Sequence, residues 1–100
     1  MAVKSLFEKG VKIAVIHMGP NGSVIYTADD MFEIPPFKTD VVNTTGAGDA
    51  YAAGFIYGML NKRSIRDAGI FASACASLFV SHEPGYAPTL AEVNNLIKVF

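Results

Sequence analysis

The chain has 100 residues, of which 51% are hydrophobic, and its formal net charge is −1. A chain of this length builds at most one small domain with a modest core. The balanced charge argues against nucleic acid as the main partner, and no apolar run reaches the ~18 to 20 residues of a membrane span. The single cysteine, Cys75, cannot form an internal disulfide, which favours a reducing, cytoplasmic setting.

The first third of the sequence predicts a helix end followed by short strands. Apolar residues at helical spacing over 1–9, followed by Gly10, predict the C-terminal end of a helix. The apolar run 11–18 is typical of a strand buried on both faces, as in a parallel sheet. Turn residues then separate this strand from two more, over 23–27 and 31–34.

The stretch 41–55 combines a predicted strand end, a glycine-rich turn and the start of an apolar helix. Backbone N–H groups of such a turn point into one hollow, and the helix N-terminus adds partial positive charge, so the hollow suits an anion such as phosphate. Asp49 follows at once. Its carboxylate could simply complement the helix dipole and cap free amides, or it could accept a proton from an attacking hydroxyl. Spacing alone leaves both interpretations open.

Helices are predicted for most of the remaining sequence. Residues 50–60 contain Gly54 and Gly58, each of which costs a helix about 1 kcal/mol relative to alanine. Close packing against a neighbouring helix or sheet would compensate, and the aromatic residues between them are expected to lie in the core. Ser64 is expected to cap a second helix that extends to about residue 80.

The end of the chain predicts a loop and a closing helix. Residues 81–88 have the composition of a loop, in which His82 and Glu83 lack the third ligand that a metal site needs. Thr89 and Glu92 form a capping box, and the apolar residues that follow predict an amphipathic helix.

Asn43-Thr44-Thr45-Gly46-Ala47-Gly48-Asp49 resembles the C-terminal signature of the PfkB family of carbohydrate and nucleoside kinases, the ribokinase-like group. The usual form of that signature begins with Asp, where this chain has Asn43. The resemblance implies an α/β fold, in which residues 1–100 are the C-terminal, nucleotide-binding portion of a three-layer α/β/α kinase domain with short strands followed by helices. The N-terminal portion, which binds substrate and carries the lid, would be absent.

The resemblance also implies an activity and roles for particular residues. The γ-phosphoryl group of ATP, accompanied by Mg²⁺, would be transferred to a hydroxyl of a sugar or nucleoside. Asp49 would act as the general base, and the amides of Gly46, Ala47 and Gly48 would hold charge on the phosphoryl oxygens. No lysine follows a glycine loop as in a Walker A motif.

Further positions are carried over from the same family. From spacing alone, Gly19 and Gly22 could simply be the ends of a hairpin turn. In the family they resemble the ends of a loop near the nucleotide phosphates, although His17 stands where a threonine is common. Ser73 falls where an asparagine borders the adenine. Asn43 and Thr45 correspond to a monovalent-cation site, which implies K⁺, and Thr45 also lies on the nucleotide side.

A second hypothesis is that the chain is a truncated or split nucleotide-binding fragment without turnover. Phosphoryl transfer needs both reactants held in place and water excluded, and the substrate-binding portion is missing. Truncation through a parallel sheet would also expose an open strand edge and apolar faces, so we expect self-association. Cys75 is expected to be a small buried apolar residue rather than a catalytic one.

Overall fold

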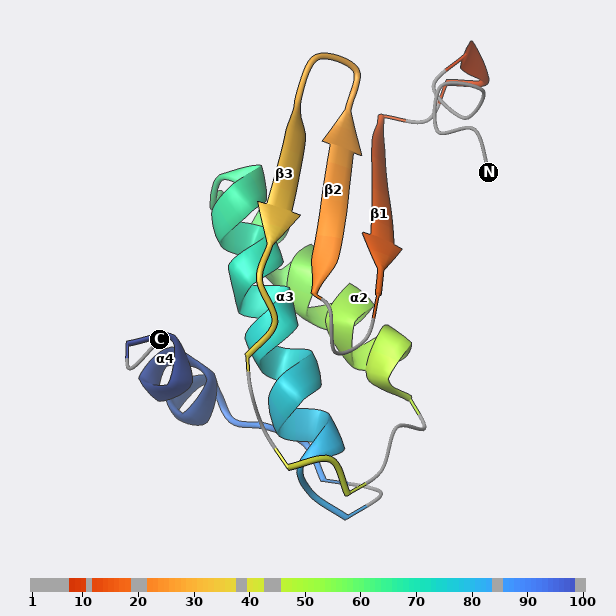
Figure 1. Ribbon diagram of the computed structural model, residues 1–100. Helices are drawn as coiled ribbons and strands as arrows, with labels where there is room; N and C mark the ends of the chain where they lie inside the picture. The colour runs from red at the N-terminus through yellow and green to blue at the C-terminus, as the bar shows by residue number, and fades with distance from the viewer. Residues whose placement is uncertain are drawn as a thin grey trace.

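The structure is a computed structural model and describes residues 8–10, 12–18, 22–37, 40–42, 46–83 and 86–98. A small sheet comes first in the chain and three helices follow (Figure 1). The elements are β1 (Ile13–His17), β2 (Ser23–Thr27), β3 (Met31–Ile34), α2 (Ala47–Leu60), α3 (Ile65–Val80) and α4 (Leu90–Lys98). The prediction of short strands followed by helices is confirmed.

The sheet is antiparallel throughout, with the order β1-β2-β3, so the expectation of a parallel sheet is wrong. The connections explain this difference, because a few residues suffice for an antiparallel hairpin whereas a parallel pair needs a crossover of a dozen or more. The β2–β3 turn is closed at Thr27, whose hydroxyl accepts a hydrogen bond from the Asp30 amide at 2.9 Å.

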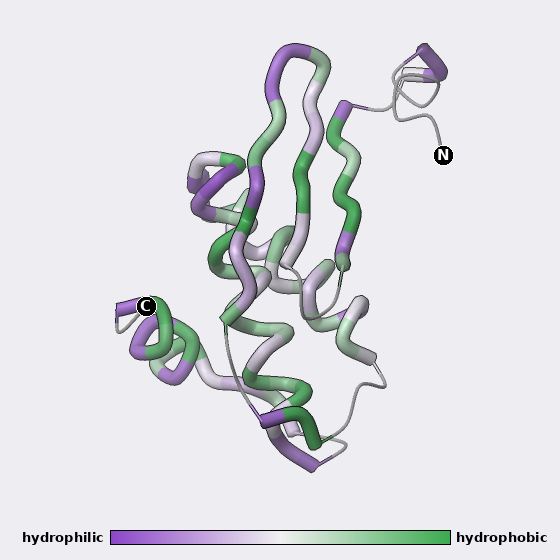
Figure 2. Tube along the Cα trace, viewed as in Figure 1, coloured by the Kyte–Doolittle hydropathy of each residue, from purple (hydrophilic) through white to green (hydrophobic). Residues whose placement is uncertain are grey.

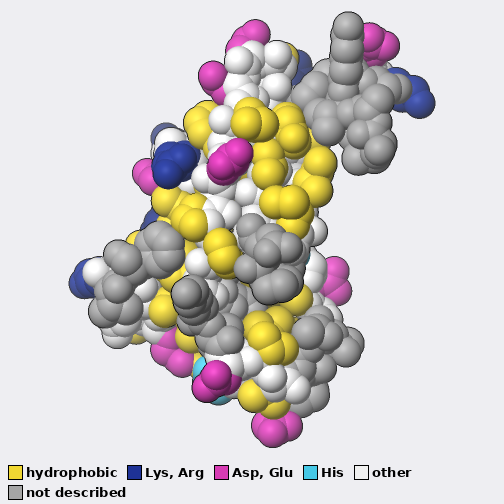
Figure 3. Space-filling view, viewed as in Figure 1, with side chains coloured by type: hydrophobic (Ala, Val, Ile, Leu, Met, Phe, Trp, Pro, Cys, Tyr) yellow, Lys and Arg dark blue, Asp and Glu magenta, His cyan; other side chains and the backbone are white. Residues whose placement is uncertain are grey.

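One face of the sheet packs against α3 and the other is open. Ile25 and Ile34, which are 0% and 2% exposed, point toward α3. By register, Tyr26 lies opposite Ala14 and Met31 on the outer face. Figure 3 looks onto that face and shows apolar side chains gathered over the strands. Ala14 on this face is 8% exposed and the other apolar side chains of β1 are half-buried, so the expected burial on both faces holds only in part for the described residues of 11–18. The expected self-association stays a prediction that the exposed part of this face favours.

Helices α2 and α3 lie side by side, and two glycines allow their close approach. A Cβ atom on Gly58 would lie 2.9 Å from the Cα and Cβ atoms of Ala68, and one on Gly54 would lie 3.0 Å from the Cα atom of Ala72. The distance at Gly58 is shorter than real Cβ contacts, and the distance at Gly54 is tighter than nearly all of them. The packing that we expected to compensate for helical glycines is confirmed as helix-on-helix contact.

The two later helices begin as their sequences predict. The hydroxyl of Ser64 accepts a hydrogen bond from the Asp67 amide at 3.1 Å. At α4, the Glu92 carboxylate accepts from the Thr89 amide at 3.1 Å and the Thr89 hydroxyl accepts from the Glu92 amide at 3.2 Å, which is a complete capping box. Helix α4 carries both hydrophobic and hydrophilic residues in each turn, as an amphipathic helix does (Figure 2). Val93 on its buried side is 2% exposed.

Two further expectations concern a strand before residue 43 and the end of a helix at Gly10. Residues 40–42 form no strand; the amide of Val42 instead donates to the carbonyl of Val80 at 2.7 Å, and the side chain of Val42 is 54% exposed. Gly10 has a φ of 95°, which suits the end of a helix, while residues 1–7 lie outside the described residues. No helix in the part of the chain that the structure describes is long and apolar enough to cross a membrane.

Candidate active site

The N-terminus of α2 is built around Gly46. Its φ of 87° lies in the left-handed region, which favours glycine, and a Cβ atom there would approach the ring of Phe79 to 3.1 Å, so a larger residue would be strained and would press on that ring. The first helical bond runs from the Ala50 amide to the Gly46 carbonyl at 3.0 Å. No side chain among the described residues caps this helix. The first amides of α2 are therefore not bound by any described side chain and are suited to an anion.

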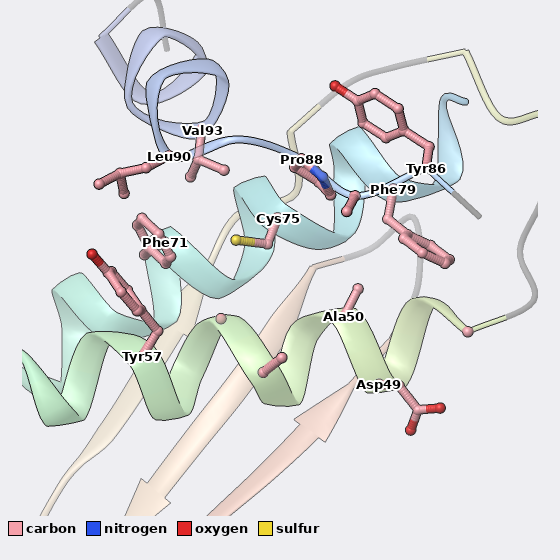
Figure 4. A pocket seen from close by; sticks show the side chains of 14 residues that line it. Asp49, Ala50, Tyr57, Phe71, Cys75, Phe79, Tyr86, Pro88, Leu90 and Val93 are labelled. Carbon is pink, nitrogen blue, oxygen red and sulfur yellow. The ribbon is translucent and has the colours of Figure 1, made fainter. Parts of the chain in front are cut away.

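Asp49 lies in the first turn of α2 and is exposed. Figure 4 shows its carboxylate directed away from α3. The carboxylate has no hydrogen bond or salt bridge to any residue that the structure describes. Asp49 therefore does not cap the helix through a hydrogen bond, which was one of the two interpretations that the sequence left open. Its carboxylate is exposed and accessible to a bound molecule.

The glycine loop after β1 is described only at its ends. The amide of Met18 donates to the carbonyl of Gly22 at 2.8 Å, which closes the hairpin. Gly22 has a φ of 92°, and a Cβ atom there would lie 2.3 Å from the carbonyl oxygen of Ile34. Gly22 is thus required by the sheet itself. Gly19 lies outside the described residues, as do Asn43 and Thr45, so their predicted roles stay predictions.

Ser73 lies on the sheet side of α3. Its hydroxyl donates to the carbonyl of Pro35 at 3.3 Å, and Ser77, one turn later, donates in the same way to the carbonyl of Phe37 at 3.2 Å. Ser73 is 7% exposed. The two serines fasten the segment after β3 along α3, and the predicted adenine contact of Ser73 stays untested.

A cavity of about 530 Å³ lies on the other side of α3, between α2, α3 and the segment 86–93 (Figure 4). Its lining comes from α2, α3, the non-helical residues 86–88 and the start of α4. The lining residues are Gly46, Asp49, Ala50, Ala53, Gly54, Tyr57, Phe71, Cys75, Phe79, Tyr86, Ala87, Pro88, Leu90 and Val93.

The aromatic residues of α2 are expected to lie in the core, and this is confirmed for Tyr51, which is 4% exposed, and for Phe55, which packs against the same buried cluster. It is wrong for Tyr57, which lines the cavity that the sequence did not reveal. Tyr57 is 39% exposed and stacks on Phe71, with ring centroids 5.2 Å apart. The guanidinium of Arg63 lies over the ring of Phe71, with its central carbon 4.7 Å from the ring centroid. The available signal was the i, i+4, i+8 spacing of Phe71, Cys75 and Phe79 along α3, which places the three side chains on one stripe.

Cys75 lines the floor of the cavity and is half-buried. Burial raises the pKa of its thiol to about 11, with the charge of Arg63 acting in the opposite direction. The thiol is therefore protonated at neutral pH, and a protonated thiol is a poor nucleophile. The expectation of a non-catalytic cysteine agrees with this environment.

Tyr86 links the loop before α4 to α4 itself. Its ring stacks on His82 with centroids 3.7 Å apart, and its hydroxyl donates to the Glu92 carboxylate. The Nδ1 atom of His82 lies 2.7 Å from the carbonyl of Leu78.

Among the described residues no group of three or more His, Cys, Asp or Glu side chains could hold a metal ion.

Comparison with known proteins places this geometry in a family. The family model described as pfkB family carbohydrate kinase matches residues 1–91. The 5-dehydro-2-deoxygluconokinase of Bacillus licheniformis is 40% identical over 99 residues, which cover 96% of this chain and 30% of that protein. The chain thus spans about 30% of the length of this curated relative.

Crystal structures of ribokinase-like enzymes superimpose on the chain. The nucleoside kinase of Methanocaldococcus jannaschii, an archaeal member of the ribokinase family, matches with a TM-score of 0.92 and 31% identity, over 100% of this chain and 34% of that one. An E. coli protein assigned as ribokinase II, in complex with ATP and Mg²⁺, matches with a TM-score of 0.94 and 26% identity, over 99% of this chain and 33% of that one. The predicted ribokinase-like α/β fold is confirmed, and the chain belongs to the pfkB family of carbohydrate kinases.

Proposed function

We propose that residues 1–100 are the nucleotide-binding and catalytic portion of a kinase that transfers the γ-phosphoryl group of ATP to a hydroxyl of a sugar or nucleoside, in a cytoplasmic setting. The observation that carries the proposal is the start of α2. An exposed, unpartnered Asp49 stands there beside amides that no described side chain caps, in a chain of the pfkB family.

The roles follow from this arrangement. The Asp49 carboxylate would take the proton of the attacking hydroxyl, while the amides of Gly46, Ala47 and Gly48 would hold the charge that develops on the phosphoryl oxygens. Bound Mg²⁺ would neutralise charge on the phosphates of ATP, largely without protein ligands in this portion. The Asp49 carboxylate is exposed and directed away from α3, so we propose that the acceptor hydroxyl is held largely by groups outside the described residues.

The remaining nucleotide contacts are proposed with different support. Gly19, Gly22 and Thr45 would lie near the phosphates; Gly22 is the one of these that is described, and it is also needed for the hairpin. For Ser73, an adenine contact would have to use the lone pairs of the hydroxyl, because its hydrogen is donated to Pro35. Asn43 with Thr45 would form the monovalent-cation site, and a K⁺ titration of turnover tests that assignment.

The acceptor is proposed to be a sugar acid before a nucleoside. Several curated relatives share the name 5-dehydro-2-deoxygluconokinase, at 40% to 45% identity, whereas the structural neighbour that is a nucleoside kinase is 31% identical. A panel of 5-dehydro-2-deoxygluconate, ribose, fructose and nucleosides, offered with ATP and Mg²⁺, discriminates between these acceptors.

The decisive test is Asp49→Asn in a completed chain, which we define as these residues preceded by the N-terminal portion of a curated relative. Loss of the base should lower kcat by about 10² to 10⁴-fold while leaving the KM for ATP nearly unchanged. Asp67→Asn is the matched control, because Asp67 occupies the first turn of α3 and is also exposed. Equal kcat for Asp49→Asn and the control would refute the assignment.

The second candidate is a nucleotide-binding fragment without turnover. It is supported by the coverage of about 30% of the curated relative's length. The 100-residue chain alone should then bind Mg²⁺–ATP in calorimetry without phosphorylating any acceptor of the panel. Transfer by the chain alone would exclude this candidate.

A further inference from the structure

A buried hydrogen bond joins β2 to α2, close to the glycines that precede each of these elements. The hydroxyls of Ser23 and Tyr51 lie 2.7 Å apart, and the two side chains are 2% and 4% exposed. Ser23 is the first residue of β2 and directly follows Gly22. Tyr51 lies in α2, two residues after Asp49. The bond therefore fixes the end of the β1–β2 hairpin to the start of the helix that carries the proposed base.

The ring of Tyr51 is seated on the same hairpin end. His17, the last residue of β1, packs against it with ring centroids 4.9 Å apart. His17 and Ser23 are directly paired across the β1–β2 ladder, so Tyr51 contacts both strands that flank the loop. On the α3 side, Tyr51 forms a buried cluster with Ala72 and Ala76.

This seat determines which way α2 faces. Residues two apart on a helix point about 200° away from each other around its axis. Tyr51 points into the core, and Asp49 consequently points outward, as Figure 4 shows for its carboxylate. Rotation of α2 about its axis would move Asp49 and the first amides of the helix together, and the Ser23–Tyr51 bond opposes that rotation.

The Ser23–Tyr51 hydrogen bond is directional, whereas the apolar contacts between α2 and α3 are not. Gly54 and Gly58 hold α2 close to α3 through small apolar surfaces, which tolerate sliding and rotation better than a hydrogen bond does. Burial raises the pKa of Tyr51, with the Ser23 hydrogen bond acting in the opposite direction, so the phenol keeps its proton at neutral pH. A buried hydroxyl that lost its partner would be left unsatisfied, which disfavours other positions of the helix.

We propose that Ser23 and Tyr51 are positioning residues, which hold Asp49 and the Gly46–Gly48 amides in register with the loop that ends at Gly22. This inference rests on the proposed function for its catalytic consequence. The structural part, that the bond pins the start of α2, stands independently. Displacing a catalytic group by ~1 Å can cost as much as 10²-fold in rate, so a small shift of α2 is sufficient to matter.

The structural part is tested on the 100-residue chain by amide hydrogen exchange. Tyr51→Phe keeps the ring and removes the hydroxyl, and it should raise the exchange rate of the Ala50 amide about tenfold relative to the amides of α3. Tyr26→Phe is the matched control, because Tyr26 lies three residues from Ser23 in the same strand and on the opposite face. An unchanged Ala50 rate, or an equal rise throughout α3, would overturn the inference.

The catalytic part is tested by kinetics in the completed chain. Tyr51→Phe and Ser23→Ala should each lower kcat about tenfold with the KM values for ATP and acceptor changed less than about twofold, and the double variant should be no worse than either. A merely structural pair would lower the midpoint of urea unfolding and leave kcat unchanged. If Asp49→Asn abolishes transfer and these variants do not lower kcat, the positioning role fails; if Asp49→Asn keeps full turnover, the proposed function fails.

Discussion

Helices α2 and α4 both begin with an acidic residue in the first turn, but the two carboxylates have different partners. Each has a carboxylate in its first turn, Asp49 in α2 and Glu92 in α4. At α4 the carboxylate accepts hydrogen bonds from the Thr89 amide in the capping box and from the hydroxyl of Tyr86. At α2 it has no partner within the described part of the chain, and Gly46 stands where α4 has Thr89. A helix start that is left uncapped gives up stability and keeps its amides and its carboxylate available for a ligand.

The start of α3 completes this comparison. Ser64 caps it in the usual way, and Asp67 donates its amide to that cap. Its first-turn carboxylate is exposed like that of Asp49. The starts of α2 and α3 therefore differ in the residue before the helix, glycine or serine, more than in the acidic residue. We propose that this difference separates a functional from a structural helix start.

Gly46→Ala should give the largest effect on this comparison. Alanine at a φ of 87° costs roughly 1 to 2 kcal/mol, and its Cβ atom would press on Phe79. The turn would shift, and the amides that are proposed to hold the phosphoryl oxygens would move with it. We expect kcat of the completed chain to fall by about 10-fold or more.

Two measurements accompany this variant. Urea unfolding should show a loss of stability, and kinetics should show a loss of kcat beyond the fraction unfolded. Gly10→Ala provides the control for alanine at positive φ, because Gly10 has a φ of 95° with nothing within 4 Å of an added Cβ atom. A kcat as high as that of this control would show that the Gly46 turn has no part in catalysis.

Ser64→Ala should have a smaller effect, and one confined to stability. The Asp67 amide would lose its acceptor, and removal of such a cap typically costs ~1 kcal/mol. Urea unfolding should show this loss, and kcat of the completed chain should stay as in the parent. A fall in kcat comparable to that of Gly46→Ala would contradict the division into structural and functional helix starts.

Local sequence signals were sufficient for the helix starts and for the tight helix pair. Ser64 and the Thr89–Glu92 box depend on residues three apart, and the need for close contact at Gly54 and Gly58 follows from helix propensity alone. Such features are decided within one or two turns of chain, so composition and spacing predict them.

Features that depend on distant segments could not be predicted in the same way. The apolar run 11–18 has the same pattern in a parallel and an antiparallel sheet, and its antiparallel pairing with β2 was not predicted. The cavity exists because the segment 86–93 crosses above the stripe Phe71, Cys75 and Phe79, which no short spacing reveals. The site at Gly46–Asp49 is a prediction from the sequence, whereas the Ser23–Tyr51 bond joins residues 28 apart and only the structure reveals it.

Glu92→Gln should give the smallest effect, and it is visible as a change with pH. The Tyr86 hydroxyl first, and then the amide and hydroxyl of Thr89, lower the pKa of Glu92 below its ordinary value of 4.5. A carboxyl whose pKa is lower in the folded state contributes stability above its unfolded pKa, and that contribution disappears as the pH falls through the folded pKa. Urea unfolding of the parent should thus lose more stability between about pH 6 and pH 3 than unfolding of Glu92→Gln. Glu83→Gln is the control, because the Glu83 side chain makes no hydrogen bond to the residues that the structure describes; parallel acid profiles for parent and Glu92→Gln would show that the capping box of α4 works without its charge.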